Sequence, residues 1–344
     1  MKAAVLYKPM DLRIEDFPMP EIGPDDVLIR VKICGICHSD YLYWKYGRIG
    51  DYVVKEPLIL GHEFSGVIEE VGENVTTLKK GDRVVVEPGV PCRRCHYCKT
   101  GRYNLCPHMK FMATPPVHGA FAEYVSSPYD FVFKMPNNMT FEEGALIEPL
   151  SVALWSIKRG NITPASSVAI LGAGAIGLIT LEALKSIGVT RIYVVDRNDW
   201  KLNLASKLGA TATFNSLKDD VVKSILSVTN GEGVDVAIET TGAEEIVKQT
   251  VKIVRNGGVI VLVGFYNKSE ISFPLIDVIW KELDIRGQIR YVNMFPIGIE
   301  LVSKGRVNVK QFITHKLPFN EIEKGFRIMD EKKEKFIKIQ VQIS

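Results

Sequence analysis

The stretch 166–188, "SSVAILGAGAIGLITLEALKSIG", decides the fold of the second half of this 344-residue chain. An apolar run comes first, glycines follow at 172, 174 and 177, and a segment with apolar residues at helical spacing completes it. A buried strand, a G-x-G-x-x-G turn and a helix in this order predict the start of a dinucleotide-binding βαβ unit. The alternative is an ordinary glycine-rich turn in an α/β domain.

Each glycine of this turn has its own physical task. Gly172 permits the tight turn, Gly174 lets the backbone approach a pyrophosphate, and Gly177 lets helix and strand pack closely. Phosphate oxygens would lie at the positive N-terminus of the helix. The turn residues predicted to contact the dinucleotide are Gly172, Gly174, Ala175, Ile176 and Gly177.

Asp196 ends the next predicted strand, "RIYVVD", 19 residues beyond Gly177. A carboxylate at this position accepts hydrogen bonds from the adenosine ribose and repels a 2′-phosphate, which favours NAD over NADP. Arg197 beside it weakens this distinction, because an arginine could meet a phosphate. We also expect Arg197, Lys201 and Val263 to lie against the cofactor.

The pattern of elements divides the chain into two domains. Apolar strands alternate with helices over 152–288, including helices at about 218–228 and 243–254, which predicts a parallel sheet covered on both faces. Residues 1–151 are instead mainly β. The tail 289–344, with helices at about 295–304 and 320–331, does not extend the alternation. We expect it to fold back onto the first domain, giving an α/β protein with domains 1–151 plus 289–344 and 152–288.

Composition excludes several classes of partner. Hydrophobic residues make up 46% and charged residues 24% of the chain, and the net charge is +3. Because there is no block of like charges, we expect no nucleic-acid partner. The longest apolar stretch, 168–181, is shorter than the about 20 residues that span a bilayer. The first residues lack a signal-peptide pattern, so we expect a cytoplasmic protein without a membrane partner.

Four of the six cysteines form a cluster in the segment 88–108, spaced C-x2-C-x2-C-x7-C. They are Cys92, Cys95, Cys98 and Cys106. Four thiolates on such short spacings close a tetrahedron around a structural zinc ion, and we interpret His96 and His108 as surface residues. An iron–sulfur cluster and a nucleic-acid-binding zinc ribbon are the rival interpretations.

A second metal site requires ligands from distant segments. Cys37 lies in "ICGICHSD" (33–40), His62 and Glu63 lie in "GHEFSG" (61–66), and Glu148 lies in "EEGALIEPLS" (142–151). Cys, His and a carboxylate around one open position are typical of catalytic zinc, which lowers the pKa of a bound hydroxyl. Glu148 could also simply start a helix, and His62 could be a buried core residue. Cys34 and Cys37 could form a redox pair, but only Cys37 has evident partners, so we expect Cys34 to be a buried filler.

These motifs together resemble the zinc-dependent medium-chain dehydrogenases of the alcohol dehydrogenase superfamily. The resemblance covers essentially the whole chain and is carried by "CGICHSD" (34–40), "GHEFSGVIEEVG" (61–72), "GDRVVVEP" (81–88), the four cysteines, "GAGAIG" (172–177) and "VVD" (194–196). Within the superfamily the chain is most similar to sorbitol and related polyol dehydrogenases, through "YWKYGRIG" (43–50), "MATPP" (112–116), "FEEGALIEPLSV" (141–152) and "IRYVN" (289–293).

The resemblance implies a fold, an activity and a set of cofactors. The fold is a GroES-like catalytic domain joined to a Rossmann domain. The activity is NAD-dependent oxidation of a secondary alcohol of a sorbitol- or xylitol-like polyol to the ketose, of the L-iditol 2-dehydrogenase type. Two zinc ions per chain, one catalytic and one structural, and a homotetramer are implied as well. Unlike many animal sorbitol dehydrogenases, this chain keeps all four lobe cysteines.

The resemblance also assigns roles to residues around the catalytic metal. Cys37 and His62 would be ligands, and Glu63 or Glu148 would complete the set, one of them through water. Asp40 would orient His62, and Ser39 would relay the substrate proton, although Ser39 could instead cap the helix that follows. His38, where a glycine is common in the family, has no assigned role.

Five residues would line the substrate pocket by the same resemblance. They are Tyr43, Phe111, Thr114, Arg290 and Tyr291. Tyr43 and Phe111 could equally be core aromatics. Arg290 and Tyr291 are adjacent, so both reach the substrate only if the strand ends or bulges there.

Other functions remain open at this point. Oxidation of threonine would pair Arg290 with a carboxylate, and oxidation of 2,3-butanediol is a further enzymatic alternative. A zinc-bearing dinucleotide-binding protein with a structural or sensor role is the non-enzymatic one. Absorbance of reduced cofactor with a substrate panel separates these functions.

Overall fold

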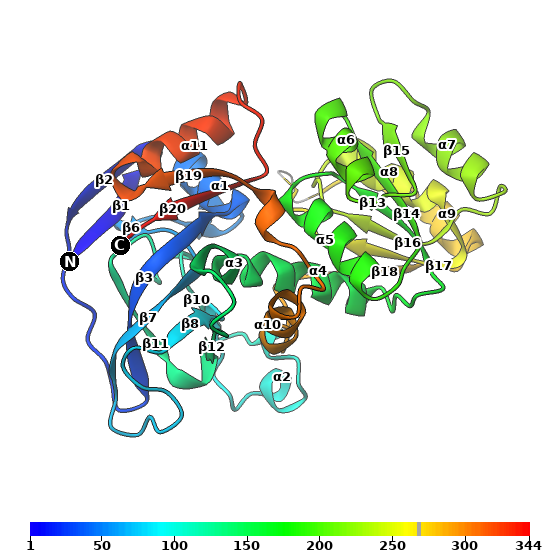
Figure 1. Ribbon diagram of the computed structural model, residues 1–344. Coiled ribbons are helices and arrows are strands. Elements are labelled where there is room, and N and C mark those ends of the chain that lie inside the picture. The colour runs from blue at the N-terminus through cyan, green and yellow to red at the C-terminus, as the bar shows by residue number, and fades with distance from the viewer. Residues whose placement is uncertain (267–269) are drawn as a thin grey trace. The chain divides into compact units, whose positions relative to one another are not determined.

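Two separated stretches of the chain fold into one unit, and the sequence between them forms another. The computed structural model describes residues 1–266 and 270–344 (Figure 1). The first unit comprises Met1–Glu148 and Phe295–Ser344, and the second comprises Pro149–Met294. These boundaries lie slightly before residue 151 and slightly after residue 289, so Arg290 and Tyr291 belong to the second unit.

The first unit is built mainly from strands, as its Val- and Ile-rich runs predict. Its largest sheet has the strand order β12-β8-β7-β3-β20-β19, and β11 also pairs with β3. In β20, Ile339 lies opposite Ile36 of β3, which confirms that the tail folds back onto the first domain. The strands are β1 (Lys2–Lys8), β2 (Asp11–Asp16), β3 (Asp26–Ile36), β4 (Arg48–Ile49), β5 (Tyr52–Val53), β6 (Leu58–Ile59), β7 (Glu63–Val71), β8 (Arg83–Val86), β9 (Gly89–Val90), β10 (Lys110–Phe111), β11 (Tyr124–Pro128), β12 (Val132–Lys134), β19 (Ile313–Pro318) and β20 (Lys338–Gln342).

Aromatic packing fixes the helices of the first unit on its sheets. Trp44 stacks on Phe326 with ring centroids 5.5 Å apart, and Phe121 meets Phe326 edge-on at 6.1 Å. All three are fully buried, and each contributes on the order of 1.5–3 kcal/mol through its burial. This packing holds the helix that begins just after Cys37. The helices are α1 (His38–Tyr46), α2 (His96–Lys99), α3 (Phe141–Ala145), α10 (Phe295–Ser303) and α11 (Ile322–Glu331), and α4 (Ile147–Arg159) runs on into the second unit.

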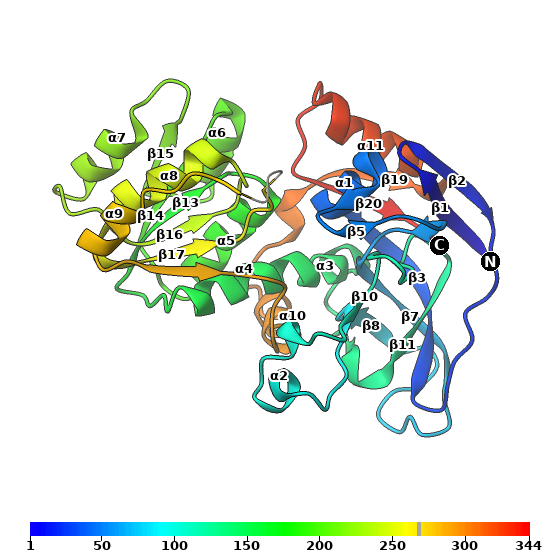
Figure 2. The same ribbon diagram turned by 180° about the vertical axis from the view of Figure 1, so that it is seen from behind.

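The second unit contains the predicted parallel sheet. Its strand order is β15-β14-β13-β16-β17-β18, and every pairing is parallel. Helices lie on both faces of the sheet (Figures 1 and 2). Successive strands β13, β14 and β15 extend the sheet in one direction, and β16, β17 and β18 extend it in the other. The strand order therefore reverses between β13 and β16. The strands are β13 (Ser167–Leu171), β14 (Arg191–Asp196), β15 (Ala212–Asn215), β16 (Val234–Glu239), β17 (Val254–Leu262) and β18 (Asp284–Gly287).

Two helices of this unit begin at a side-chain cap, provided by Asn198 and Asp220. The helix expected at about 218–228 begins only at Val221, because the Asp220 carboxylate accepts the N–H of Lys223 at 3.1 Å and sets the first turn. The helix expected at about 243–254 covers Glu244–Ile253. One helix, α9, is additional to those expected from the sequence, and α4 begins next to Glu148, where a helix start was the alternative interpretation. The helices are α5 (Ala175–Ser186), α6 (Asp199–Lys207), α7 (Val221–Val228), α8 (Glu244–Ile253) and α9 (Leu275–Trp280).

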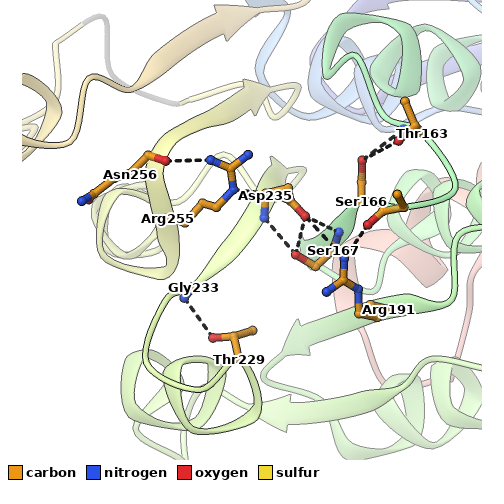
Figure 3. Close-up of polar contacts among 10 residues, drawn as sticks. Thr163, Ser166, Ser167, Arg191, Thr229, Gly233, Asp235, Arg255 and Asn256 are labelled. Atoms are coloured by element: carbon orange, nitrogen blue, oxygen red, sulfur yellow. Dashed lines mark hydrogen bonds and ion pairs between the residues drawn. The ribbon is translucent and has the colours of Figure 1, made fainter.

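A polar cluster ties the amino ends of the parallel strands together (Figure 3). Asp235 in β16 accepts the backbone N–H and the hydroxyl of Ser167 in β13 at 2.7 and 2.8 Å. Its other oxygen accepts Arg255 Nε in β17 at 2.6 Å. Burial acts to raise the pKa of Asp235, but the bonds from Ser167 and Arg255 outweigh it and lower this pKa. The cluster therefore favours an ionised carboxylate at the end of the sheet opposite the glycine turn.

Within 1–266 and 270–344, no helix has both the length and the apolar character that crossing a bilayer requires.

Candidate active site

The four lobe cysteines bring their sulfur atoms together. Their Sγ atoms all lie within 4.8 Å of one another, and those of Cys95 and Cys98 are 3.4 Å apart. The backbone N–H of Arg94 lowers the pKa of Cys92 to about 6, and the N–H of Cys92 donates to Cys106 Sγ at 3.3 Å. Burial and the neighbouring sulfurs instead raise the pKa of Cys98 to about 12. Four free thiols whose sulfur atoms converge in this way fit a zinc ion held by four sulfurs. The side chains of His96 and His108 are exposed.

Strand register brings Cys37 beside His62. β3 and β7 are antiparallel with Gly35 opposite Glu63, so the residues just past β3 face those just before β7. Cys37 follows β3 and caps α1, and His62 precedes β7. The Cys37 sulfur, a His62 ring nitrogen and a Glu63 carboxylate oxygen all lie within 4.8 Å of one another. Three ligands of these types fit a catalytic zinc, whose fourth position takes water or substrate.

Asp40 connects the two segments that carry these groups. It is fully buried, and its carboxylate accepts the N–H of Cys37 and the N–H of Gly61, each at 2.9 Å. Its Oδ1 lies 3.5 Å from His62 Nδ1. Burial alone lowers the pKa of His62, but Asp40 and Cys37 hold this pKa well above its ordinary value. Asp40 therefore fixes the spacing of the two segments and faces one ring nitrogen of His62.

Glu63 pairs with a second buried charge, Lys338 of β20. The two side chains form an ion pair and are 1% and 5% exposed. Burial alone lowers the pKa of Lys338, but Glu63 and Cys37 raise it, so the ammonium stays charged. Lys338 thus places a positive charge against the Glu63 carboxylate beside Cys37 and His62.

Glu148, the other predicted carboxylate ligand, lies outside the group of converging atoms found among the described residues. It is buried in the first turn of α4, and its charge acts on Lys338 and on Glu87. It lies near the Glu63–Lys338 pair, and it also has the helix-start position that was the alternative interpretation. Of the two glutamates, the geometry therefore favours Glu63 for direct contact with a metal.

Three predicted pocket residues of the first unit surround His62. The Phe111 ring lies against the His62 ring, with centroids 5.4 Å apart. Tyr43 in α1 hydrogen-bonds to Thr114, and the charges of Asp40 and His62 act on its phenol. Burial raises the pKa of Tyr43 to about 12, so at neutral pH its hydroxyl stays protonated and can donate a hydrogen bond. Tyr43 and Phe111 are therefore more than remote core aromatics.

The rest of "ICGICHSD" divides into different environments. Ser39 is the second residue of α1, whose N-cap is Cys37, so the alternative that Ser39 caps this helix is wrong. Cys34 is fully buried in the core, and both it and Cys37 are free thiols. His38 stacks on Tyr41 with ring centroids 5.4 Å apart.

The glycine turn of the second unit has the geometry that its motif predicts. Gly172 has φ +112°, in the region that side chains disfavour. A Cβ on Gly177 would lie 1.8 Å from the carbonyl oxygen of Gly172, so this packing requires glycine. A Cβ on Gly174, the N-cap of α5, would meet no described atom within 4 Å, which leaves the helix N-terminus open to a ligand. Ala175 and Ile176 form the first turn of α5.

Asp196 lies at the end of β14, next to this turn. Its carboxylate accepts the N–H of Ala173 at 2.7 Å and the N–H of Asn198 at 2.9 Å. These bonds tie it to the glycine turn and fix its direction. Arg197 is exposed and Lys201 is half-buried one turn into α6. Val263 follows β17, where its N–H donates to the Glu239 carbonyl at 2.9 Å.

The last two pocket residues lie beyond the sheet of the second unit. β18 ends at Gly287, so Arg290 and Tyr291 are not in a regular strand and need not face opposite sides. Arg290 has φ +52°, and Tyr291 is 2% exposed.

Comparison with known proteins places this site in a family. Residues 23–137 match the alcohol dehydrogenase GroES-like domain, and residues 175–304 match the zinc-binding dehydrogenase domain. The chain is 42% identical over 341 residues to a sorbitol dehydrogenase of Bacillus subtilis, covering 99% of this chain and 97% of that one. The chain belongs to the zinc-dependent medium-chain dehydrogenases.

Further relatives place this dehydrogenase among the polyol dehydrogenases of the superfamily. It is 44% identical over 321 residues to D-xylulose reductase A of Aspergillus niger, covering 92% of this chain and 89% of that one. Its fold matches 2R,3R-butanediol dehydrogenase from Bacillus subtilis with a TM-score of 0.91 and 36% identity, covering 99% of both chains. The GroES-like and Rossmann parts expected from the sequence are thereby confirmed.

Three buried groups of this dehydrogenase were not predicted from the sequence. Lys338 holds Glu63, and Glu239 is fully buried at the carboxyl end of β16. Glu87 accepts the Tyr103 hydroxyl at 2.7 Å, and burial raises the pKa of Glu87 to about 7. The available signal was a charged residue inside or directly after an apolar strand, as in "FIKIQV" for Lys338 and "VAIET" for Glu239.

Proposed function

We propose that this chain oxidises a secondary hydroxyl of a polyol such as sorbitol or xylitol to the ketone, with hydride transfer to NAD. The observation that carries the proposal is the convergence of Cys37, His62 and Glu63 within 4.8 Å. The glycine turn and Asp196 of the second unit support the dinucleotide part. The likeness to sorbitol dehydrogenase and D-xylulose reductase supports a polyol substrate.

Two zinc ions per chain belong to this proposal. Cys37, His62 and Glu63 would hold the catalytic ion, with Glu148 in reach through water, and the four lobe cysteines would hold the structural one. When bound, the catalytic ion acts as a Lewis acid that lowers the pKa of the substrate hydroxyl. Asp40 keeps the Cys37 and His62 segments in register, and Lys338 holds the Glu63 carboxylate in place through their ion pair.

The residues around the metal ligands orient the substrate and move its proton. The Tyr43 hydroxyl donates to a substrate oxygen, and the Phe111 ring forms one side of the site, in contact with the His62 ring. Ser39 Oγ, half-buried in the first turn of α1, relays the proton that leaves the substrate hydroxyl, because it accepts that proton while its own hydroxyl proton passes to solvent water. Thr114, Arg290 and Tyr291 are further proposed substrate contacts.

NAD is the proposed hydride acceptor. Its pyrophosphate would lie on the glycine turn, and its adenosine ribose would donate to Asp196. Exchanging Asp196 for Ala should reduce the preference for NAD over NADP at least about tenfold, since the ribose bonds and the repulsion of a 2′-phosphate are both lost. The ratio of kcat/KM values for the two cofactors measures this preference.

A substrate panel tests the proposed function. The zinc-loaded protein is mixed with NAD and with sorbitol, xylitol, threonine or 2,3-butanediol, and the absorbance of reduced cofactor is followed. We expect the fastest rise with a polyol. A rise with none of the four would contradict a dehydrogenase, and a rise with threonine alone would contradict a polyol substrate.

2,3-Butanediol is the second candidate substrate because of the structural likeness to 2R,3R-butanediol dehydrogenase. A polyol and 2,3-butanediol present different groups to Tyr43 and Thr114. A polyol carries further hydroxyls beside the reacting one, whereas butanediol ends in methyl groups next to its hydroxyl pair. Exchanging Tyr43 for Phe should therefore slow a polyol more than butanediol.

A homotetramer in the cytoplasm completes the proposal. Four of the six residues of α9 are apolar and have exposed fractions of 61–79%. Along the chain α9 is followed by β18, which is an edge strand of the sheet (Figure 2). We propose that a second copy of this chain pairs antiparallel with β18. Centring the pair on Ile285 sets Asp284 of each copy opposite Arg286 of the other. Six free cysteines suit a reducing compartment.

Cross-linking tests this register. The N–H of Gln288 donates to Leu262 of β17, so the backbone groups of Ile285, an odd number of residues earlier, face outward. Two Ile285 residues in a hydrogen-bonded antiparallel pair have Cα atoms about 5.5 Å apart, within disulfide reach. Ile285→Cys should form covalent dimers on mild oxidation, and Thr213→Cys in β15 at the other edge should not. Dimers from both or from neither would contradict the register.

A further inference from the structure

Glu239 is a fully buried carboxylate with no assigned role in the proposed reaction. It ends β16, directly beside the point where the strand order reverses between β13 and β16. Its Oε1 accepts the N–H and the hydroxyl of Thr241, at 2.6 and 2.5 Å, and the N–H of Gly242 at 3.1 Å. Its Oε2 accepts the Tyr266 hydroxyl at 2.7 Å. One carboxylate thus binds both the loop after β16 and the segment after β17.

The same residue binds the second segment through its backbone. The Glu239 carbonyl accepts the N–H of Val263 at 2.9 Å and the N–H of Gly264 at 3.1 Å. The two segments also touch directly, because a Cβ on Gly264 would lie 2.2 Å from the Gly242 nitrogen and one on Gly242 would lie 2.1 Å from the Phe265 carbonyl oxygen. Only glycines at both positions permit this approach, and Glu239 lies beneath it.

Thr240 extends the connection to the glycine turn. Its hydroxyl donates to the Leu171 carbonyl at 3.0 Å and lies 3.3 Å from the Gly172 carbonyl. Its backbone N–H donates to the Leu171 carbonyl at 2.9 Å. The ends of β13, β16 and β17 therefore form one bonded surface, which we call the Glu239 clamp: Glu239, Thr240, Thr241, Gly242, Gly264 and Tyr266.

The position of the clamp determines which part of a dinucleotide it serves. The adenosine ribose would bind at Asp196 over β14, and the pyrophosphate would bind at the glycine turn after β13. A dinucleotide crosses the sheet where the strand order reverses, so its other nucleoside lies over the ends of β16 and β17. Those are the strand ends that the clamp joins.

We infer that Glu239 is a positioning residue for the nicotinamide half of the cofactor, because it holds the loops after β16 and β17 together at the sheet edge. This inference rests on the proposed NAD-dependent function. Tyr266 supports it chemically: burial and the Glu239 carboxylate raise the pKa of Tyr266, so its phenol stays protonated and donates.

The test compares a whole dinucleotide with ADP, which lacks the nicotinamide nucleoside. Binding of NADH and of ADP to the zinc-loaded protein is titrated for the wild type, Glu239→Gln and Tyr266→Phe. We expect Glu239→Gln to bind NADH roughly tenfold more weakly, the change that one lost hydrogen bond produces. Tyr266→Phe, which removes one O–H at the rim of the clamp, should weaken NADH binding less. ADP should bind both variants within about twofold of the wild type, since its adenosine and phosphates lie over Asp196 and the glycine turn.

Asp235→Asn is the matched control, because Asp235 lies in the same strand at the opposite end and also accepts backbone and side-chain donors (Figure 3). It should leave the ratio of the NADH and ADP affinities unchanged. If Glu239→Gln binds NADH like the wild type, or loses both ligands equally, the inference is wrong. If the wild type binds neither ligand, the proposed function itself fails. Folding of each variant is checked by its urea unfolding midpoint.

Discussion

Exchanging Asp40 for Asn should weaken both the fold and the metal site. The carboxylate accepts two backbone donors, the N–H groups of Cys37 and Gly61, each at 2.9 Å in a fully buried position. An amide keeps one oxygen, so one of these N–H groups faces an NH2 group instead of an acceptor. A buried donor left unpaired costs about 1–3 kcal/mol of stability.

The loss should appear in the metal site as well, because Asp40 also faces His62 Nδ1 at 3.5 Å. Removing such a partner of a metal-bound histidine lowers metal affinity about 10–100-fold. That factor corresponds to about 1.4–2.8 kcal/mol, similar to the expected loss of stability. The two effects arise from different contacts of the same carboxylate and are measured separately.

Urea unfolding of the zinc-free protein measures the first effect, and competition with a chelator of known affinity measures the second. Asp235→Asn is the control, since it removes a comparable carboxylate in the second unit and should lower stability without changing zinc affinity. Unchanged zinc affinity in Asp40→Asn would show that Asp40 does not position His62. Unchanged stability would show that its two backbone bonds contribute nothing net.

Three further predictions concern the other sites. Gly177→Ala should weaken NADH binding at least about tenfold in a fluorescence titration, because its Cβ would lie 1.8 Å from the Gly172 carbonyl oxygen and α5 must shift; unchanged binding would contradict this packing. Cys98→Ser should lower the zinc content from two ions per chain to one and lower the unfolding midpoint, with metal analysis as the check; two ions in the variant would contradict the four-sulfur site. The bonds from Ser167 and Arg255 lower the pKa of Asp235, so the stabilising effect of this carboxylate should be present above about pH 4 and disappear as the pH falls further. Urea midpoints of wild type and Asp235→Asn that differ equally at pH 7 and pH 3 would argue against this effect.

The sequence predicts best where the interacting residues are close along the chain. The four lobe cysteines fall within 15 positions, so their spacing alone indicates a shared metal. The glycine turn likewise follows from one local stretch, because strand, turn and helix lie next to one another. The return of the tail onto the first domain was predicted from the break in the alternating pattern, and the pairing of β20 with β3 confirms it.

The parts that escaped prediction depend on contacts between distant residues. Glu63 and Glu148 were equal candidates in the sequence, and the choice between them depends on the convergence of Glu63 with Cys37 and His62 in the folded chain. The pairing of Glu63 with Lys338, which lies 275 residues later, was likewise not predictable from the sequence. The start of α7 at Val221 depends on a single cap by Asp220. Tyr266 lies 27 residues after Glu239 and follows a different strand, and neither residue type alone indicates the hydrogen bond between them.

Turnover by Cys37→Ala tests the central claim most directly. In the proposed site the Cys37 thiolate is a metal ligand, so its removal should abolish formation of reduced cofactor from a polyol and NAD. The four-cysteine lobe and the fold should stay intact, with one zinc ion left per chain. A variant that keeps two zinc ions and forms reduced cofactor at the wild-type rate would contradict the account.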